Sequence, residues 1–107
     1  EDRVTIISPD DRSPLPHPVE FIICMDVLEH LYHPTHLLKQ VLFPALRAGG
    51  FLMLQAPWGG PTPSHLPEAT KDFYTGGGRT FLKRNFREIY PMTRMDISGV
   101  WEKQGKR

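Results

Sequence analysis

The sequence has little cysteine, and Cys24 is the single one among 107 residues. One cysteine cannot form a disulfide within the chain, so a small fold held by covalent cross-links is excluded. The same usage suits a reducing compartment, and we expect a cytoplasmic protein.

Long apolar runs and an excess of charge of one sign are also missing. No apolar stretch approaches the length of a membrane span and no signal peptide is visible, so we expect no membrane contact. A formal net charge of +1 is too balanced to favour nucleic acid as a partner. The basic run over residues 103–107 is therefore expected to be a solvated end.

The composition is that of a folded protein. Hydrophobic residues make up 39% of the chain and charged residues 23%, and its length suits one modest domain over residues 1–107. The 11 prolines concentrate at residues 9–18 and 57–67, which predicts loops there. We expect the second of these loops to extend over residues 57–78 as a long connection or insert.

The segments between the loops predict a strand–helix–strand unit. Residues 19–24 (VEFIIC) are almost continuously apolar, which is typical of a strand covered on both faces in a parallel sheet. Residues 35–46 place three leucines and a valine on one face of a helix. Residues 51–55 (FLMLQ) predict the next strand, so the three elements together indicate one crossover unit.

Prolines and glycines predict where these elements begin and end. We expect Pro34 in the first turn of the helix, Pro44 to end or kink it, and Gly49-Gly50 to form the turn into the next strand. The remaining predicted elements are a strand at 4–7, a helix at 80–86, and two closing strands at 87–92 and 96–102. The whole pattern predicts an α/β fold.

Three acids and bases follow the strand at residues 19–24: Asp26, Glu29 and His30. Their i, i+3, i+4 spacing places them on one face of a helical turn, just outside the carboxyl end of a strand, where α/β sheets bind ligands. Two carboxylates and an imidazole suit a divalent ion such as Mg²⁺ or Mn²⁺. The alternative is structural, with Asp26 capping the turn, Glu29 favouring the helix dipole and His30 making a packing hydrogen bond.

Two further features near this turn are expected to be structural rather than chemical. The spacing of His30, His33 and His36 spreads them around a helix, which disfavours a zinc site. Cys24 lies at the end of an apolar strand and is expected to be a small buried hydrophobe.

The segment FIICMDVLEHLYHPTHLLKQVLFPALRAGGFLMLQAPW resembles the middle of a class I S-adenosylmethionine-dependent methyltransferase. The shared features, in order, are an apolar strand, an acid-x-x-Glu-His turn, an amphipathic helix ending near two glycines, an apolar strand and a proline. The segment also reads Cys-Met-acid-x-x-Glu-His, as in the ubiquinone-pathway O-methyltransferases. The likeness is close over residues 19–58 and looser toward both ends.

The resemblance implies a partial fold. The family's glycine-rich loop and the acid that holds the ribose have no counterpart here, so the chain matches the carboxyl-terminal half of a Rossmann-like methyltransferase sheet. In that sheet the strand VEFIIC lies at the centre and pairs with the missing first strand. We therefore expect its free edge to be covered by a second copy in a homo-oligomer, by a separate amino-terminal half, or by residues 4–7 (VTII).

The resemblance also implies an activity, the transfer of a methyl group from S-adenosylmethionine to the oxygen or nitrogen of a small molecule. Met25 matches the position that touches the methionine part of the cofactor. Asp10 or Asp11 matches the acid that accepts a hydrogen bond from the adenine amino group. Asp26, at the end of the strand, is expected to join the cofactor-binding residues.

His30 or His65 is expected to act as the base if the methyl acceptor must lose a proton. Some relatives use the acid-x-x-Glu-His turn and a later histidine to hold a metal ion, which here gives Asp26, Glu29, His30 and His65 as ligands of Mg²⁺ in a metal-dependent methyltransferase. The other alternative is a non-catalytic half-domain that serves as an interaction module. In each case the isolated chain is expected to bind the cofactor weakly or not at all, because the glycine-rich loop is missing.

Overall fold

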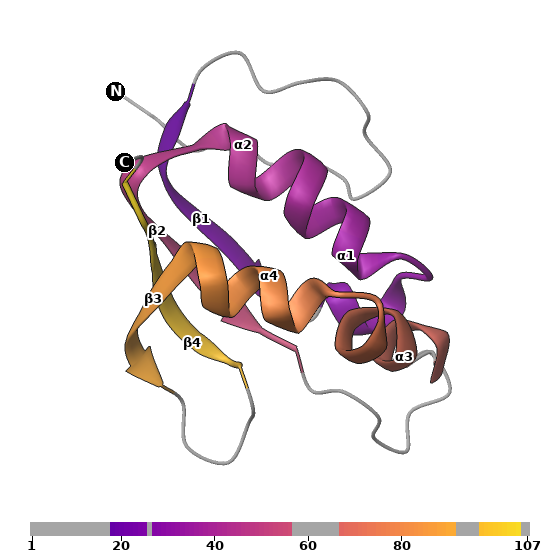
Figure 1. The fold of residues 1–107 in the computed structure, drawn as a ribbon. Coiled ribbons are helices and arrows are strands. Elements are labelled where there is room, and N and C mark those ends of the chain that lie inside the picture. Colours follow the sequence, from indigo (N-terminus) through magenta and orange to yellow (C-terminus); the bar gives the residue numbers. More distant parts are fainter. Residues whose placement is uncertain (1–17, 26, 57–66, 92–96, 106–107) are drawn as a thin grey trace.

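A computed structural model describes residues 18–25, 27–56, 67–91 and 97–105 (Figure 1). The strand predicted at residues 4–7 lies outside the described residues. The elements, in chain order, are β1 (Val19–Met25), η1 (Leu28–His30), α1 (Pro34–His36), η2 (Leu37–Leu42), α2 (Phe43–Ala45), β2 (Leu46–Gln55), α3 (Pro67–Thr75), α4 (Gly78–Asn85), β3 (Phe86–Pro91) and β4 (Gly99–Lys103).

The four strands form one mixed sheet in the order β1-β2-β4-β3. β1 and β2 are parallel and are joined by a helix, as the strand–helix–strand pattern predicts. β4 is antiparallel to both of its neighbours, so β3 runs in the same direction as β2. The α/β class and the two closing strands are confirmed, although β4 begins at Gly99.

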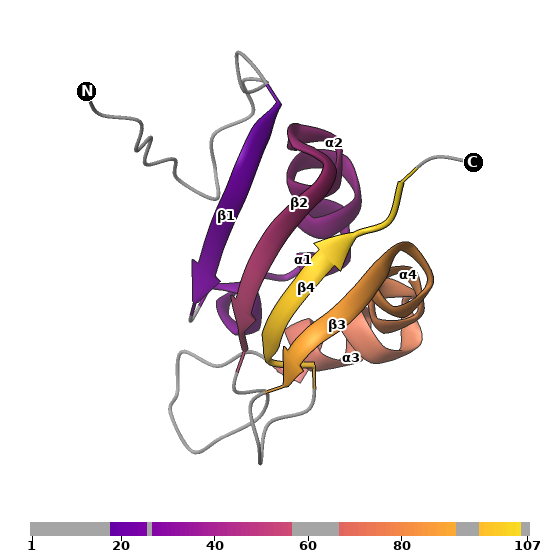
Figure 2. The ribbon, with the colours of Figure 1, turned by 90° about the vertical axis from the view of Figure 1, so that its left-hand side faces the viewer.

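The helices all lie on one face of the sheet, and the strands form the other layer (Figures 1 and 2). The core fills the space between the layers. It joins the inward-facing side chains of the sheet to those of the helices, and its members include Leu52, Leu54, Trp101, Leu38, Leu42, Phe73 and Leu82. The prediction that β1 is covered on both faces is wrong, because Phe21 and Ile23 are 47% and 61% exposed on the face away from the helices.

The segments α1, η2 and α2 form one continuous helical run over residues 34–45, called here the crossover helix. Pro34 occupies its first turn, as predicted, where a missing N–H costs nothing. Pro44 has no N–H to donate and its ring would clash with the carbonyl of Gln40 in a regular α-helix. The turn before it widens to the π form, in which Phe43 N donates to Leu38 O, and the helix ends at Ala45.

The glycine pair at 49–50 lies inside β2 rather than in a turn before it, which corrects the prediction. The register jumps here, from Val19 opposite Leu46 to Phe21 opposite Phe51. Gly49 adopts a φ of +83°, and a Cβ on Gly50 would lie 2.9 Å from backbone oxygens of both strands. The glycines therefore allow an irregular start to the strand rather than a reversal of the chain.

The loop predicted over residues 57–78 is wrong for part of its length, because α3 occupies Pro67–Thr75. This helix buries only Ala69 and Phe73, one turn apart, so its sequence carries too few apolar positions for a clear helical period. The helix predicted at 80–86 is present as α4 but begins at Gly78. Its start is fixed by close packing, since a Cβ on Gly78 would lie 2.6 Å from both Phe73 and Thr35.

Candidate functional site

The candidate site lies at the carboxyl end of β1, where the strand is followed by η1. Cys24 and Met25 close the strand, and Glu29 and His30 lie in η1. The other residues proposed for the site fall outside the described residues: Asp10, Asp11, Asp26 and His65. Their predicted roles therefore stay predictions.

Glu29 and His30 lie together in η1. The Glu29 side chain is 1% exposed, the His30 side chain is 34% exposed, and Glu29 Oε2 lies 3.3 Å from His30 Nε2. The two groups form an ion pair when the imidazole is protonated. A carboxylate in this position restrains the ring, so the pair links a buried negative group to an imidazole that reaches the surface.

Cys24 is buried beside the same pair. Burial and then the negative charge of Glu29 raise the pKa of the Cys24 thiol to about 12. The thiol is therefore neutral at physiological pH and is not a nucleophile. This confirms the prediction of a small buried hydrophobe.

Met25 is the last residue of β1 and is 38% exposed. Its partner in the register is Gln55, the last residue of β2, so the two parallel strands end side by side. The carboxyl ends of parallel strands are where open α/β sheets bind ligands. Met25 is thus available to a ligand at that edge.

A buried hydrogen bond, not marked by any sequence pattern, fixes the end of β2. Ala56 N donates to Oγ of Ser98 over 3.2 Å, and Ser98 is fully buried. Beside it, Trp101 Nε1 donates to Ile97 O over 2.7 Å, and Ile97 adopts a φ of +59°, which is rare for a β-branched residue. The start of β4 is therefore anchored to the edge at which β1 and β2 end.

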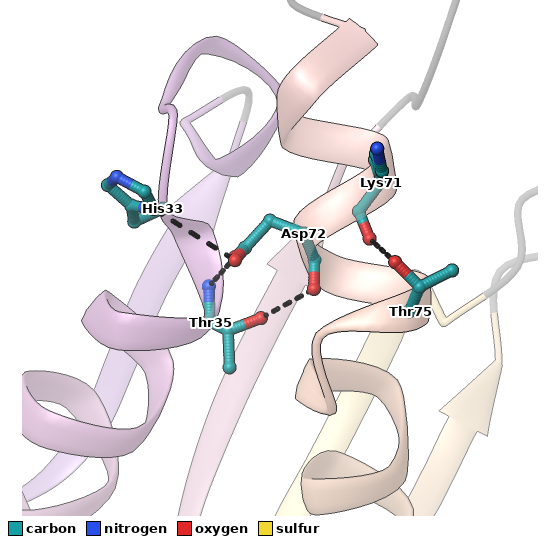
Figure 3. A network of polar contacts seen from close by, with 5 residues as sticks. All are labelled: His33, Thr35, Lys71, Asp72 and Thr75. Atoms are coloured by element: carbon teal, nitrogen blue, oxygen red, sulfur yellow. Dashed lines mark hydrogen bonds and ion pairs between the residues drawn. The ribbon is translucent and has the colours of Figure 1, made fainter.

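Asp72 of α3 holds the amino end of the crossover helix, as Figure 3 shows. Thr35 N donates to Asp72 Oδ2 over 2.9 Å, and Thr35 Oγ1 donates to Asp72 O over 3.1 Å. His33 Nδ1 lies 4.0 Å from Asp72 Oδ1. A carboxylate here satisfies an unpaired N–H of the first turn and favours the positive end of the helix dipole.

Lys103 of β4 holds the other end of the crossover helix. Its Nζ donates to Phe43 O over 2.7 Å and to Leu46 O over 2.5 Å, and it lies 4.0 Å from the centroid of the Phe43 ring. Burial lowers the pKa of the Lys103 ammonium. The prediction of a solvated basic end over residues 103–107 is therefore wrong for Lys103, which pairs with carbonyls at the end of a helix.

A metal site is not assembled by the residues that the structure describes. No group of three or more His, Cys, Asp or Glu gathers among them, and this includes His30, His33 and His36. Of the four ligands proposed for Mg²⁺, only Glu29 and His30 belong to the described part. The metal-dependent alternative stays a prediction.

An open hollow of about 300 Å³ lies at the opposite end of β1 from the candidate site. It is lined by Glu20, Phe21, Arg47, Gly49, Gly50 and Phe51. An exposed ion pair, Arg47 Nη1 to Glu20 Oε2 at 2.9 Å, spans it. This hollow therefore has neither the location nor the titratable groups of the candidate site.

Within the described residues, no helix has the length and apolar content needed to cross a membrane. In comparisons with family models, with curated proteins and with solved structures, nothing matches this chain.

Proposed function

We propose that this chain is part of an enzyme that transfers a methyl group from S-adenosylmethionine to a small molecule. One observation carries this proposal. The parallel strands β1 and β2 end side by side, with Met25 exposed at that edge and the Glu29–His30 pair in the next turn. An edge of this kind is the usual ligand site of an α/β sheet, and its sequence is the part of the chain with the methyltransferase resemblance.

The described residues fit simple roles in such a reaction. The cofactor supplies an electrophilic methyl group on its sulfonium. Met25 contacts the methionine part of the cofactor, and the partly exposed His30 accepts the proton of a hydroxyl or amine acceptor. Glu29, buried and 3.3 Å from His30, keeps the ring in place as a positioning residue.

The position of β1 supports the proposal that the fold is the carboxyl-terminal half of a Rossmann-like methyltransferase sheet. Among the described residues β1 pairs with β2 alone, so it lies at the edge of the sheet. In the resembled fold this strand is central and pairs with the first strand. In the resembled fold, the first strand and the glycine-rich loop that follows it would lie at this edge of β1.

Methyl NMR of the methionines tests the proposal directly. The chain has four methionines, and their labelled methyl groups are followed during titration with S-adenosylhomocysteine at millimolar concentration. We expect the Met25 resonance to shift and saturate with an affinity weaker than micromolar, because hydrogen bonds from the missing loop are lost at about 1–3 kcal/mol each.

Met53 serves as the comparison signal, because it lies two residues before the end of β2 and opposite Ile23 rather than Met25. Its resonance is expected to shift less than that of Met25, and Met25→Ala is expected to abolish saturable binding. A titration that leaves Met25 unmoved, or moves Met53 equally, contradicts the proposed site. Micromolar binding would show that the chain is not the half of the fold proposed here.

A further inference from the structure

The face of the sheet opposite the helices is turned toward the viewer in Figure 2, and it carries several exposed apolar residues. Residues opposite one another in neighbouring strands share a face, and the register places them in rows. Phe21 lies beside Phe51, and Ile23 lies beside Met53. Val100 lies beside Met53 on one side and beside Tyr90 on the other. These six residues, Phe21, Ile23, Phe51, Met53, Tyr90 and Val100, are called here the open sheet face.

The charges on and near this face cancel. Arg87 and Glu102 are opposite one another at one end of the face and form an ion pair, with Nη2 2.7 Å from Oε1. In β1 the charged residue is Glu20, which alternates with Phe21 and pairs with Arg47. A surface dominated by charge of one sign would repel its own copy. The open sheet face lacks that protection, and it also lacks the lysines with which sheets commonly prevent association.

The exposed area is close to the minimum that a specific interface needs. Phe21 and Ile23 are about half exposed, and Tyr90 is 67% exposed. Aromatic side chains present about 150–250 Å² each and aliphatic ones less, so the exposed fractions of the six residues amount to roughly 500 Å² per copy. Two such faces together would bury about 1,000 Å², the smallest area expected of a specific protein interface.

We propose that the open sheet face binds a second copy of this chain, so that two sheets pack face to face about a two-fold axis. A two-fold axis brings the same neutral apolar surface from each copy into contact, and the aromatic side chains interdigitate as in a two-sheet sandwich. Pairing of two β1 strands edge to edge would leave Phe21, Ile23 and Phe51 in water. Face-to-face packing therefore removes more apolar surface from water. The inference does not depend on methyl transfer.

Sedimentation of the full chain over a concentration series, from micromolar to near-millimolar, tests this inference with a matched pair of variants. Ile23→Lys places a charge in the open sheet face, where the side chain is 61% exposed in one copy. Tyr32→Lys changes a side chain of similar exposure, 62%, that lies outside the sheet. We expect the unmodified chain and Tyr32→Lys to dimerise alike, and Ile23→Lys to weaken dimerisation by about tenfold or more with an unchanged circular dichroism spectrum.

A measurement on the unmodified chain covers the case in which Ile23→Lys fails to fold. A soluble paramagnetic agent broadens methyl signals that reach the solvent, so the Met53 signal is expected to become protected as the concentration rises. A chain that stays monomeric over the whole concentration series overturns the proposal. A dimer that survives Ile23→Lys, with slowed amide exchange in β1 and an unprotected Met53, also overturns it and indicates edge-to-edge pairing.

Discussion

The two faces of the sheet differ sharply although the same strands build both. In β2, Leu52 is buried against the helices, whereas its neighbour Phe51 is 38% exposed on the other side. In β1, the buried Cys24 follows directly after the exposed Ile23. Both faces are apolar in sequence, so hydrophobicity alone does not decide which face becomes the core. The difference shows that helices packing on one side, rather than the composition of the strands, define the interior of this domain.

Alanine substitutions at adjacent positions of β2 give the largest expected contrast between the faces. Leu52→Ala leaves a cavity in the core and is expected to lower the free energy of unfolding by about 2–5 kcal/mol. Phe51→Ala removes a partly exposed side chain and is expected to cost about 1 kcal/mol or less in the monomer. Urea denaturation at low protein concentration measures both. Equal losses would mean that the open sheet face is covered within one copy of the chain.

Replacing Asp72 tests how much its contacts with the crossover helix contribute to the stability of the helical layer. Asp72→Ala leaves Thr35 N without its acceptor and is expected to cost about 1–2 kcal/mol in the free energy of unfolding. Asp72→Asn keeps an acceptor of nearly the same shape and is expected to lose less. The ranking would be contradicted if the alanine and asparagine variants melted at the same temperature as the unmodified chain.

The thiol on the covered face gives the stability a specific pH dependence. Because the pKa of the Cys24 thiol is raised in the folded chain, the thiol keeps its proton there from pH 9 to about 12, whereas the thiol of the unfolded chain loses its proton above pH 9. The contribution of the thiol to the free energy of unfolding is therefore fully present below pH 9 and falls as the pH rises, by at most about 1.4 kcal/mol per pH unit. Cys24→Ala is expected to remove this slope in denaturation curves collected across the alkaline range.

The difference in stability between the unmodified chain and Cys24→Ala, measured at each pH, reports the contribution of the thiol alone. The lowered pKa of Lys103 acts in the opposite sense, because the unfolded chain then binds more protons and stability rises with pH. That contribution is present in both proteins and cancels in the comparison. Parallel pH curves for the unmodified chain and Cys24→Ala would show that the thiol is not buried in the folded state.

Added metal is expected to have the smallest effect. The Glu29 carboxylate is buried and lies against His30, so millimolar Mg²⁺ or Mn²⁺ is expected to leave the melting temperature unchanged. Differential scanning fluorimetry of the unmodified chain and of His30→Ala provides the measurement. A rise in melting temperature that His30→Ala abolishes would instead support a site formed by Asp26, Glu29, His30 and His65.

Local features of the fold were accessible from the sequence, and contacts between distant segments were not. The apolar run before Cys24, the leucines after Pro34 and the strand before Pro57 predict the parallel unit because each signal lies within a few residues. Helix α3 was missed since only Ala69 and Phe73 mark its buried side. Coverage of β1 was predicted wrongly, because an apolar run does not reveal what packs on each face.

The same limit applies to the candidate site. The placement of Met25 at a strand end and of Glu29 beside His30 follows from their neighbours in sequence. Three other contributions could not be read in this way: the buried Ser98, the carboxylate of Asp72 and the ammonium of Lys103. Each acts on a segment more than 30 positions away, and polar residues used once at such separations leave no periodic pattern.

The two ends of the crossover helix are hydrogen-bonded by side chains that are synthesised well after the helix itself. Asp72 lies 37 positions beyond Thr35, and Lys103 lies 60 positions beyond Phe43. During translation the helix therefore leaves the ribosome with both ends unpaired, and a helix of this length is only marginally stable by itself in water. We expect folding to wait for β4, because closing such long loops delays the contacts that complete the helix. Until β4 has been synthesised, the nascent chain would expose the leucines of the crossover helix, and a chaperone that binds exposed apolar segments could bind them.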